Sequence, residues 1–193
     1  MNLADVCHKP GEHRGLLPGR VGVLEACLTV PDHATEQYVA LLGHPHSLKG
    51  GTMHNKVVTT LTKLCSTLGI PSLRFNFRGV GASEGAYDAG MGESDDMLDL
   101  AKQCQVAWPK AQLLFAGFSF GSFVAYRAAA HIEHALLLTV APPVNHFDFT
   151  ACPTDPAPWI LVQGDKDDVI PPEKVFNFAE TRDITVIRFA ETG

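Results

Sequence analysis

The spacing of hydrophobic residues along this chain alternates between the pattern of a buried strand and that of a helix. Continuous apolar runs of strand length, such as residues 39–42, are typical of strands that are buried on both faces of a sheet. Such runs, and the glycines and prolines that end them, predict strands at residues 21–30, 37–43, 72–77, 112–117, 135–141, 159–163 and 184–190.

Segments with helical period lie between these strands. In residues 54–68 the side chains of Val57, Leu61 and Leu64 share one face, and Gly69 marks the end of the helix. The same pattern predicts helices at residues 93–108, 120–130 and 172–180. Strands that alternate with helices predict an α/β fold with a mostly parallel central sheet flanked by helices. Ligands of such sheets bind at the carboxyl ends of the strands.

Composition sets the frame for function. The chain has 193 residues, of which 46% are hydrophobic and 19% charged, as in ordinary globular domains. Residues 1–19 show no period and are rich in Pro and Gly, so we expect an irregular N-terminal arm before one domain at residues 20–193. The net charge of −6 argues against nucleic acid or an anionic membrane as a partner. Five cysteines without a Cys-x-x-Cys pair, no signal-peptide pattern and no membrane-length apolar run together predict a cytoplasmic protein.

The strongest chemical signal is the stretch Gly117-Phe118-Ser119-Phe120-Gly121. It follows an apolar strand and opens a helix, which is the context of a nucleophile elbow. The tight turn lifts the serine above the sheet, and the close packing leaves no room for side chains two residues before and after it. Ser119 is therefore the candidate nucleophile. The alternative is a strand-to-helix turn with an incidental serine.

A second match to the same motif occurs at Gly81-Ala82-Ser83-Glu84-Gly85. This stretch lies inside a Gly-rich loop, and no apolar helix follows it directly. Because the motif works only between a strand and a helix, we do not expect Ser83 to be the nucleophile.

Acyl transfer needs two N–H donors directed at the developing oxyanion. The sequence predicts one at the backbone of Phe120, the residue after the candidate nucleophile. The other is expected in the loop after an earlier strand, at the backbone of His46, with Ser47 as the second choice. An alternative interpretation makes His44, His46 and His54 metal ligands. The usual further ligands are not apparent near them, so we expect no metal and no cofactor.

A catalytic acid is expected after the strand at residues 159–163, where three aspartates compete. Asp167 is the predicted acid, because a carboxylate there would orient a histidine and stabilise its cation. Asp165 and Asp168 are expected to cap the turn or the helix that begins near Pro172. An acidic loop that is merely solvated is the alternative.

The order of the triad points to a histidine after the acid. All nine histidines of the chain precede Asp167. His131 and His134 stand at the far end of the helix after the candidate nucleophile, and His146 is at best a remote substitute. We therefore expect the catalytic histidine beyond residue 193, with residues 1–193 lacking the final histidine loop and closing helix and having little activity alone.

Taken together, these motifs resemble the compact, lidless α/β-hydrolases similar to dienelactone hydrolase. The resemblance rests on residues 43–46, 50–56, 74–83, 117–121 and 163–167. It implies an α/β-hydrolase fold with no cap domain, Ser119 as nucleophile, Asp167 as acid, and a histidine after the last strand. Only about 17 residues separate the strands at which the family often inserts a cap, so we expect an open site for small or extended acyl substrates.

Two classes of function follow from these residues. The first is a serine hydrolase of esterase or acyl-hydrolase type whose partner is a small-molecule acyl substrate. The second is a non-catalytic binding or scaffold protein on a hydrolase fold, because a fold alone does not give a function. A serine peptidase with the same machinery is a further alternative.

Overall fold

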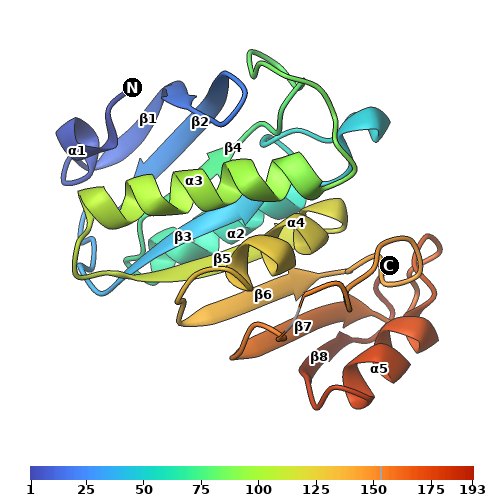
Figure 1. The fold of residues 1–193 in the computed structure, drawn as a ribbon. Helices are drawn as coiled ribbons and strands as arrows, with labels where there is room; N and C mark the ends of the chain where they lie inside the picture. Colours follow the sequence, from blue (N-terminus) through green and yellow to red (C-terminus); the bar gives the residue numbers. More distant parts are fainter. Residues whose placement is uncertain (153) are drawn as a thin grey trace.

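A central β-sheet forms the middle of this protein, with helices on both of its faces (Figure 1). The computed structural model describes residues 1–152 and 154–193. The sheet has eight strands in the order β1-β2-β4-β3-β5-β6-β7-β8. The strands are β1 Gly11–Pro18, β2 Val23–Val30, β3 Tyr38–Gly43, β4 Ser72–Phe75, β5 Gln112–Phe118, β6 Leu136–Val140, β7 Trp159–Gly164 and β8 Thr185–Phe189. The helices are α1 Leu3–Val6, α2 Lys56–Thr67, α3 Met91–Ala107, α4 Phe120–Ala129 and α5 Pro172–Glu180, with a 3-10 helix at Ser47–Lys49.

Parallel pairing dominates the sheet, as the sequence pattern predicts. Every neighbouring pair from β4 to β8 is parallel, whereas β2 pairs antiparallel with both β1 and β4. Each predicted strand and helix is present within a few residues of its expected bounds. The parallel strands end at one edge of the sheet, and the loops that leave this edge carry the residues discussed below.

Helices cover the two faces of the sheet unequally. The larger core lies under α3 and α4, where Phe75, Phe115 and Leu100 are completely buried. The opposite face packs against α2 through Ala40, Leu42 and other small apolar residues. In the described residues α2 is the helix on that face, and the outer strand β8 leaves Ile187 and Phe189 43% and 51% exposed. Each fully buried Leu or Phe side chain contributes about 1.5–3 kcal/mol to folding.

The predicted N-terminal arm is not irregular, so this expectation was wrong. Residues 3–6 form α1, and residues 11–18 form the edge strand β1, which pairs with β2 along its whole length. Only Leu17 of β1 is buried, so the strand lacks a hydrophobic pattern. Glycine is uncommon in strands, so the pairing with β2, and not the local sequence, stabilises the extended conformation of β1.

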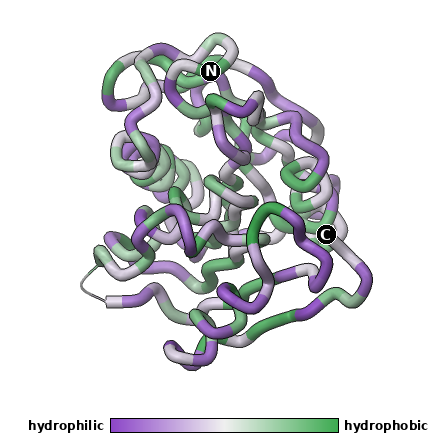
Figure 2. The backbone as a smooth tube through the Cα atoms, turned by 90° about the vertical axis from the view of Figure 1, so that its right-hand side faces the viewer, coloured by the Kyte–Doolittle hydropathy of each residue, from purple (hydrophilic) through white to green (hydrophobic). Residues whose placement is uncertain are grey.

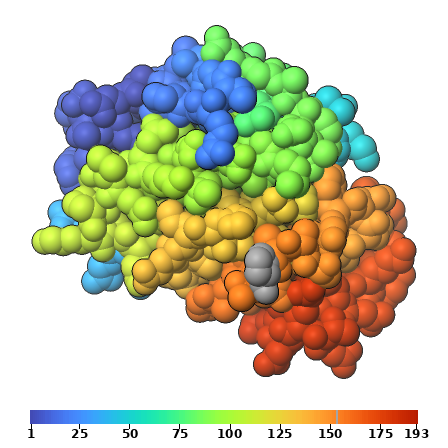
Figure 3. Space-filling view, in the orientation of Figure 1, coloured from blue at the N-terminus to red at the C-terminus, as the bar shows by residue number. Residues whose placement is uncertain are grey.

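Figure 2 shows the molecule turned by 90°, and hydrophilic and hydrophobic stretches alternate along its backbone. This alternation matches elements that bury one face and expose the other. The N-terminal and C-terminal segments gather at opposite ends of the molecule (Figure 3). No helix in the described residues is long and apolar enough to cross a membrane.

Candidate active site

Ser119 stands at a sharp turn between β5 and α4. Its φ of 53° and ψ of −121° lie in a region that residues with a side chain rarely adopt. The turn is held because the Ser119 N–H donates to the Val140 carbonyl at 2.8 Å, and the Ser122 N–H donates to the Ser119 carbonyl at 2.8 Å. The hydroxyl is therefore presented at the carboxyl end of the sheet, at the start of a helix.

Two glycines make this turn possible. A Cβ on Gly117 would lie 2.0 Å from the Gly121 carbonyl oxygen. A Cβ on Gly121 would lie 2.4 Å from the carbonyl of Gly43, at the end of β3. Both contacts are with backbone atoms that cannot turn aside, so the spacing of the motif is a steric requirement of this packing.

The buried side chain of Ser122 fastens the turn to its neighbours. Its hydroxyl lies 2.8 Å from the Gly117 carbonyl oxygen and 3.1 Å from that of Val140. The helix behind it is buried almost all round, with nine of its ten residues buried. Sequence reasoning missed Ser122, although a small polar residue directly after the motif was the available signal.

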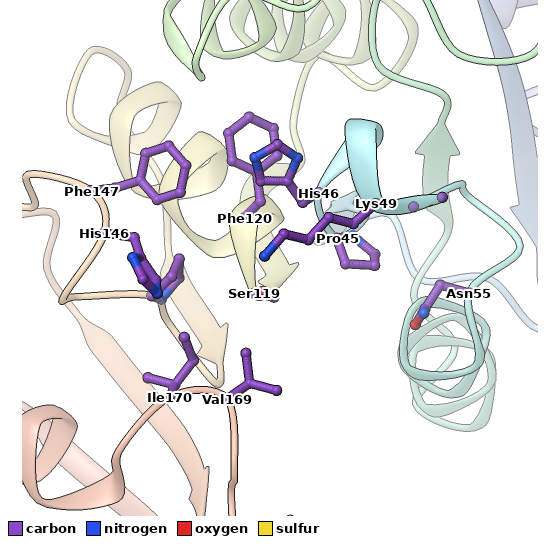
Figure 4. Close-up of a pocket in the computed structure, with 13 residues that line it drawn as sticks. Pro45, His46, Lys49, Asn55, Ser119, Phe120, His146, Phe147, Val169 and Ile170 are labelled. Carbon is purple, nitrogen blue, oxygen red and sulfur yellow. The ribbon is translucent and has the colours of Figure 1, made fainter.

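A cavity of about 340 Å³ opens beside Ser119 (Figure 4). Phe147, Val169 and Ile170 lie on one side of it, and Lys49 and Asn55 lie on the other, with Ser119 between them. The cavity is open, and its lining comes from the loops after β3, β6 and β7. This arrangement is the one expected for a ligand site at the edge of a parallel sheet.

The structure brings Phe120 and His46 together beside Ser119. Their rings are 5.0 Å apart, and both residues line the cavity. As the first residue of α4, Phe120 has an N–H without an acceptor one turn earlier in the helix. Two N–H groups near a nucleophilic hydroxyl are the elements of an oxyanion hole. Their roles remain predictions.

The ring of His46 is clamped by hydrogen bonds on both nitrogens. Its Nδ1 accepts from the Leu48 N–H at 3.3 Å, and its Nε2 is 3.2 Å from the Tyr87 hydroxyl. The Tyr87 ring also stacks on His46 with centroids 5.0 Å apart. Burial, with a smaller contribution from the Lys49 charge, lowers the pKa of His46. Tyr87 comes from the long loop after β4, and nothing in the sequence indicated this contact.

His44 has a structural role in the same loop. It is completely buried, its Nδ1 lies 2.7 Å from the Pro45 carbonyl oxygen, and its Nε2 accepts from the Phe77 N–H at 2.9 Å. These bonds fit a neutral ring with its proton on Nδ1. Burial lowers the pKa of His44 to about 4. A nitrogen that is occupied by a backbone N–H is not free for a metal. In the described residues, no group of three or more His, Cys, Asp or Glu side chains could hold a metal ion.

Asp167 is the one of the three aspartates that the loop holds in a fixed position. Its Oδ1 accepts from the N–H groups of Val169 and Ile170, both at 2.9 Å, and its Oδ2 accepts from the Gln163 side chain at 3.2 Å. The expectation that Asp165 or Asp168 caps this turn was wrong, because both are exposed and Asp167 itself makes the capping bonds. The cap of α5 is Pro171, without a side-chain bond.

The last residues after β8 fold back onto the loop that carries Asp167. The Lys166 N–H donates to the Thr192 carbonyl at 2.8 Å. A Cβ on Gly193 would lie 2.2 Å from the Lys166 carbonyl oxygen and 3.3 Å from the Asp167 nitrogen. The backbone at residue 193 is thus in contact with the candidate acid loop.

Comparison with known proteins places this arrangement in a family. A serine hydrolase without a lid from Xanthomonas campestris is 40% identical with a TM-score of 0.89, over 94% of this chain and 85% of that one. The chain belongs to the lidless α/β serine hydrolases. A homologue of this hydrolase class from Coxiella burnetii is 39% identical with a TM-score of 0.88, over 93% of this chain and 88% of that one.

Two further matches complete the comparison. An uncharacterized protein from Rickettsia prowazekii is 39% identical over 144 residues, which is 71% of this chain and 60% of that protein. An esterase from Pyrococcus furiosus shares the fold at 17% identity, with a TM-score of 0.76 over 100% of this chain and 86% of that one. No family model matches the chain.

The histidines of this lidless hydrolase lie in different places. His146 lines the same cavity as Ser119, closer to the site than the sequence suggested. His134 faces a separate pocket and bonds the Ile132 carbonyl, so it is remote as expected. In the described residues, no imidazole is hydrogen-bonded to the Ser119 hydroxyl.

Ser83, the serine of the second motif, is part of the scaffold. Its hydroxyl donates to the Asn76 carbonyl at 2.7 Å and accepts from the Glu25 N–H at 2.9 Å. The Glu25 carboxylate accepts from the Ala82 N–H and from Asn76, and these bonds hold its pKa below the usual range. A serine with both hydrogen-bonding capacities used in this way stabilises a loop and is not placed as a nucleophile.

Proposed function

We propose that this protein hydrolyses carboxylic esters of small or extended acyl groups, with Ser119 as the nucleophile. The observation that carries the proposal is the strained turn at Ser119, which presents its hydroxyl to an open cavity in a chain of the serine-hydrolase family. A backbone conformation of this kind costs free energy and is found mainly at functional sites.

The proposed reaction has two steps, acylation of Ser119 and hydrolysis of the acyl-enzyme. The Ser119 oxygen attacks the ester carbonyl and gives its proton to a histidine, and the N–H groups of Phe120 and His46 stabilise the oxyanion. Collapse expels the alcohol, which takes the proton from the histidine. Water then attacks the acyl-enzyme with the histidine as base, releasing the acid and restoring the Ser119 hydroxyl.

We assign the histidine to a position beyond residue 193, oriented by Asp167. Support comes from the order of the triad in this fold and from the contact between Gly193 and the acid loop. The two oxygens of Asp167 are fixed by three N–H donors, so the carboxylate is preorganised to orient an imidazole.

A fluorophosphonate probe tests the nucleophile directly, because it reacts only with an activated serine. The full-length protein is expected to be labelled at Ser119, and the Ser119→Ala variant to escape labelling. Ser83→Ala, in the second copy of the motif, is the matched control and should be labelled like the parent once its melting temperature shows that it is folded. Absence of labelling at Ser119 in the folded protein would contradict the proposal and favour the non-catalytic binding function.

The size of the acyl group gives a second test. A cavity of about 340 Å³ open to solvent suits short or extended chains. We expect 4-nitrophenyl acetate and butyrate to be hydrolysed with higher kcat/KM than the palmitate ester. Better turnover of the palmitate ester would contradict the substrate class.

A further inference from the structure

The cavity beside Ser119 has two walls of different chemistry. Phe147, Val169 and Ile170 form an apolar wall, and Figure 4 shows them on the side of Ser119 away from Lys49 and Asn55. The second wall is polar and comes from the loop between β3 and α2. An ester whose carbonyl lies at Ser119 would therefore place one part on apolar side chains and another part toward the Lys49 ammonium.

Among the described residues, the charged side chain that lines the cavity is a cation. Its lining contains Lys49 and no aspartate or glutamate, in a chain of net charge −6. In the described residues, no carboxylate lies within salt-bridge distance of the Lys49 ammonium, whereas Lys102 and Lys166 each have such a partner. Asp167, two residues before Val169 of the lining, accepts from the N–H groups of Val169 and Ile170 and from the Gln163 side chain of β7.

The positive charge of Lys49 also acts on His46, beside Ser119. The Lys49 charge contributes, after burial, to lowering the pKa of the His46 imidazole. The backbone of His46 belongs to the candidate oxyanion hole, so a positive charge stands close to the place where the substrate carbonyl would lie.

We propose that the site prefers esters that carry a carboxylate, with Lys49 binding this second anionic group. The inference rests on the proposed ester hydrolysis and names its substrate class. The apolar wall takes the uncharged part of such a substrate, and the Lys49 wall takes the part that ends in the carboxylate. Because Lys49 is exposed, the attraction is of the surface type and weakens with salt.

A matched pair of esters measures this preference. Phenyl hydrogen adipate and phenyl hexanoate differ by a carboxylate in place of a terminal methyl group. With the full-length protein, and after correction for the uncatalysed rates, we expect kcat/KM to be about fivefold higher for the adipate ester, through a lower KM. The advantage should fall toward one as sodium chloride is raised to about 0.5 M.

Variants at Lys49 assign the effect. Lys49→Met removes the charge and keeps the length of the chain, so the ratio of kcat/KM for the adipate ester to kcat/KM for the hexanoate ester should fall to about one. Lys49→Arg keeps the charge and should keep the advantage. Lys63→Met is the matched control, because it changes the net charge equally on the exposed part of α2 outside the cavity.

The outcomes separate this inference from the function on which it rests. If hexanoate is hydrolysed and Ser119 is labelled, but the two esters have equal kcat/KM or Lys49→Met keeps the advantage, only the anionic preference is wrong. If Lys63→Met lowers the advantage as much as Lys49→Met, the effect is general attraction by the protein and the Lys49 site is wrong. If neither ester is hydrolysed and Ser119 is not labelled, the proposed function fails and the inference falls with it.

Discussion

Acidification is expected to destabilise this protein through one buried histidine. His44 is neutral in the folded state, with its Nε2 accepting from the Phe77 N–H and its ring 4.0 Å from the Phe77 ring. Protonating Nε2 would set a proton against that N–H and place a charge in a buried site. His46 lies two residues later in the same loop, so the same event would disturb the candidate oxyanion hole.

The magnitude follows from the two pKa values of His44. The pKa is about 4 when folded against 6.5 when free, so the unfolded chain binds the proton more strongly. Stability from this group is therefore fully present above pH 6.5 and is lost as the pH falls toward 4. From pH 7 to pH 5 the loss is about 2 kcal/mol, and it approaches about 3 kcal/mol below pH 4. His46, whose pKa is also lowered, adds a smaller loss of the same sign.

Urea unfolding at pH 7 and pH 5 measures this effect. His44→Gln can keep a donor and an acceptor in the ring's place, and it should show a pH dependence that is smaller by about 2 kcal/mol than that of the parent. His131→Gln, at an exposed histidine, is the control and should follow the parent. If His44→Gln loses as much stability between pH 7 and pH 5 as the parent does, His44 is not the group responsible and the reasoning is wrong.

Three further substitutions test the site in the full-length protein. Asp167→Asn should lower kcat/KM about 10²- to 10⁴-fold in an ester assay. It should change the free energy of unfolding by only about 1–2 kcal/mol, because the amide oxygen can keep the bonds to the backbone N–H groups. An unaltered rate would rule Asp167 out as the acid. His146→Ala should leave the rate within about threefold, whereas a loss near 10³-fold would make His146 the base. Tyr87→Phe removes the hydroxyl at His46 and should lower kcat about threefold to tenfold at constant KM, and a rise in KM alone would argue for a substrate contact instead.

The sheet and the elbow could be predicted because short-range patterns determine them. The apolar run around Val39–Leu42 is buried between β4 and β5, as its composition indicates. Gly117 and Gly121 are required by contacts within a few residues and with one neighbouring strand. Such features depend on chain geometry that recurs wherever the motif occurs, so the sequence carries them.

Residues 1–19 could not be predicted in the same way. The strand β1 is held by pairing with β2, and its alternating exposure leaves only Leu17 in the core. A tyrosine in the loop after β4 is likewise invisible to periodicity, although Tyr87 contacts His46 from 41 residues away. Contacts of this kind appear only when distant loops are brought to the same sheet edge.

The choice among the three aspartates shows where local reasoning reaches its limit. The sequence favours Asp167 because of its expected catalytic role, and the structure distinguishes it by three hydrogen bonds that no spacing rule predicts. Asp165 and Asp168 point to solvent, although aspartates in a turn commonly cap it. The residue that caps this turn is the candidate acid itself, so its carboxylate is held in place by the backbone it stabilises.

The residues that position the nucleophile differ from those that line the cavity, which explains how one scaffold can serve different substrates. The position of Ser119 is fixed by backbone atoms of Gly117, Gly121 and Val140, which substitutions elsewhere on the surface do not reach. Lys49 and Val169, by contrast, are exposed residues of loops that border the same cavity. Exposed loop positions tolerate change at little cost in stability, because few buried contacts depend on them. Substrate preference can therefore vary through the cavity walls while the nucleophile stays in place, and the Lys49 variants test this independence directly: they should alter the choice between the two esters and leave the labelling of Ser119 unchanged.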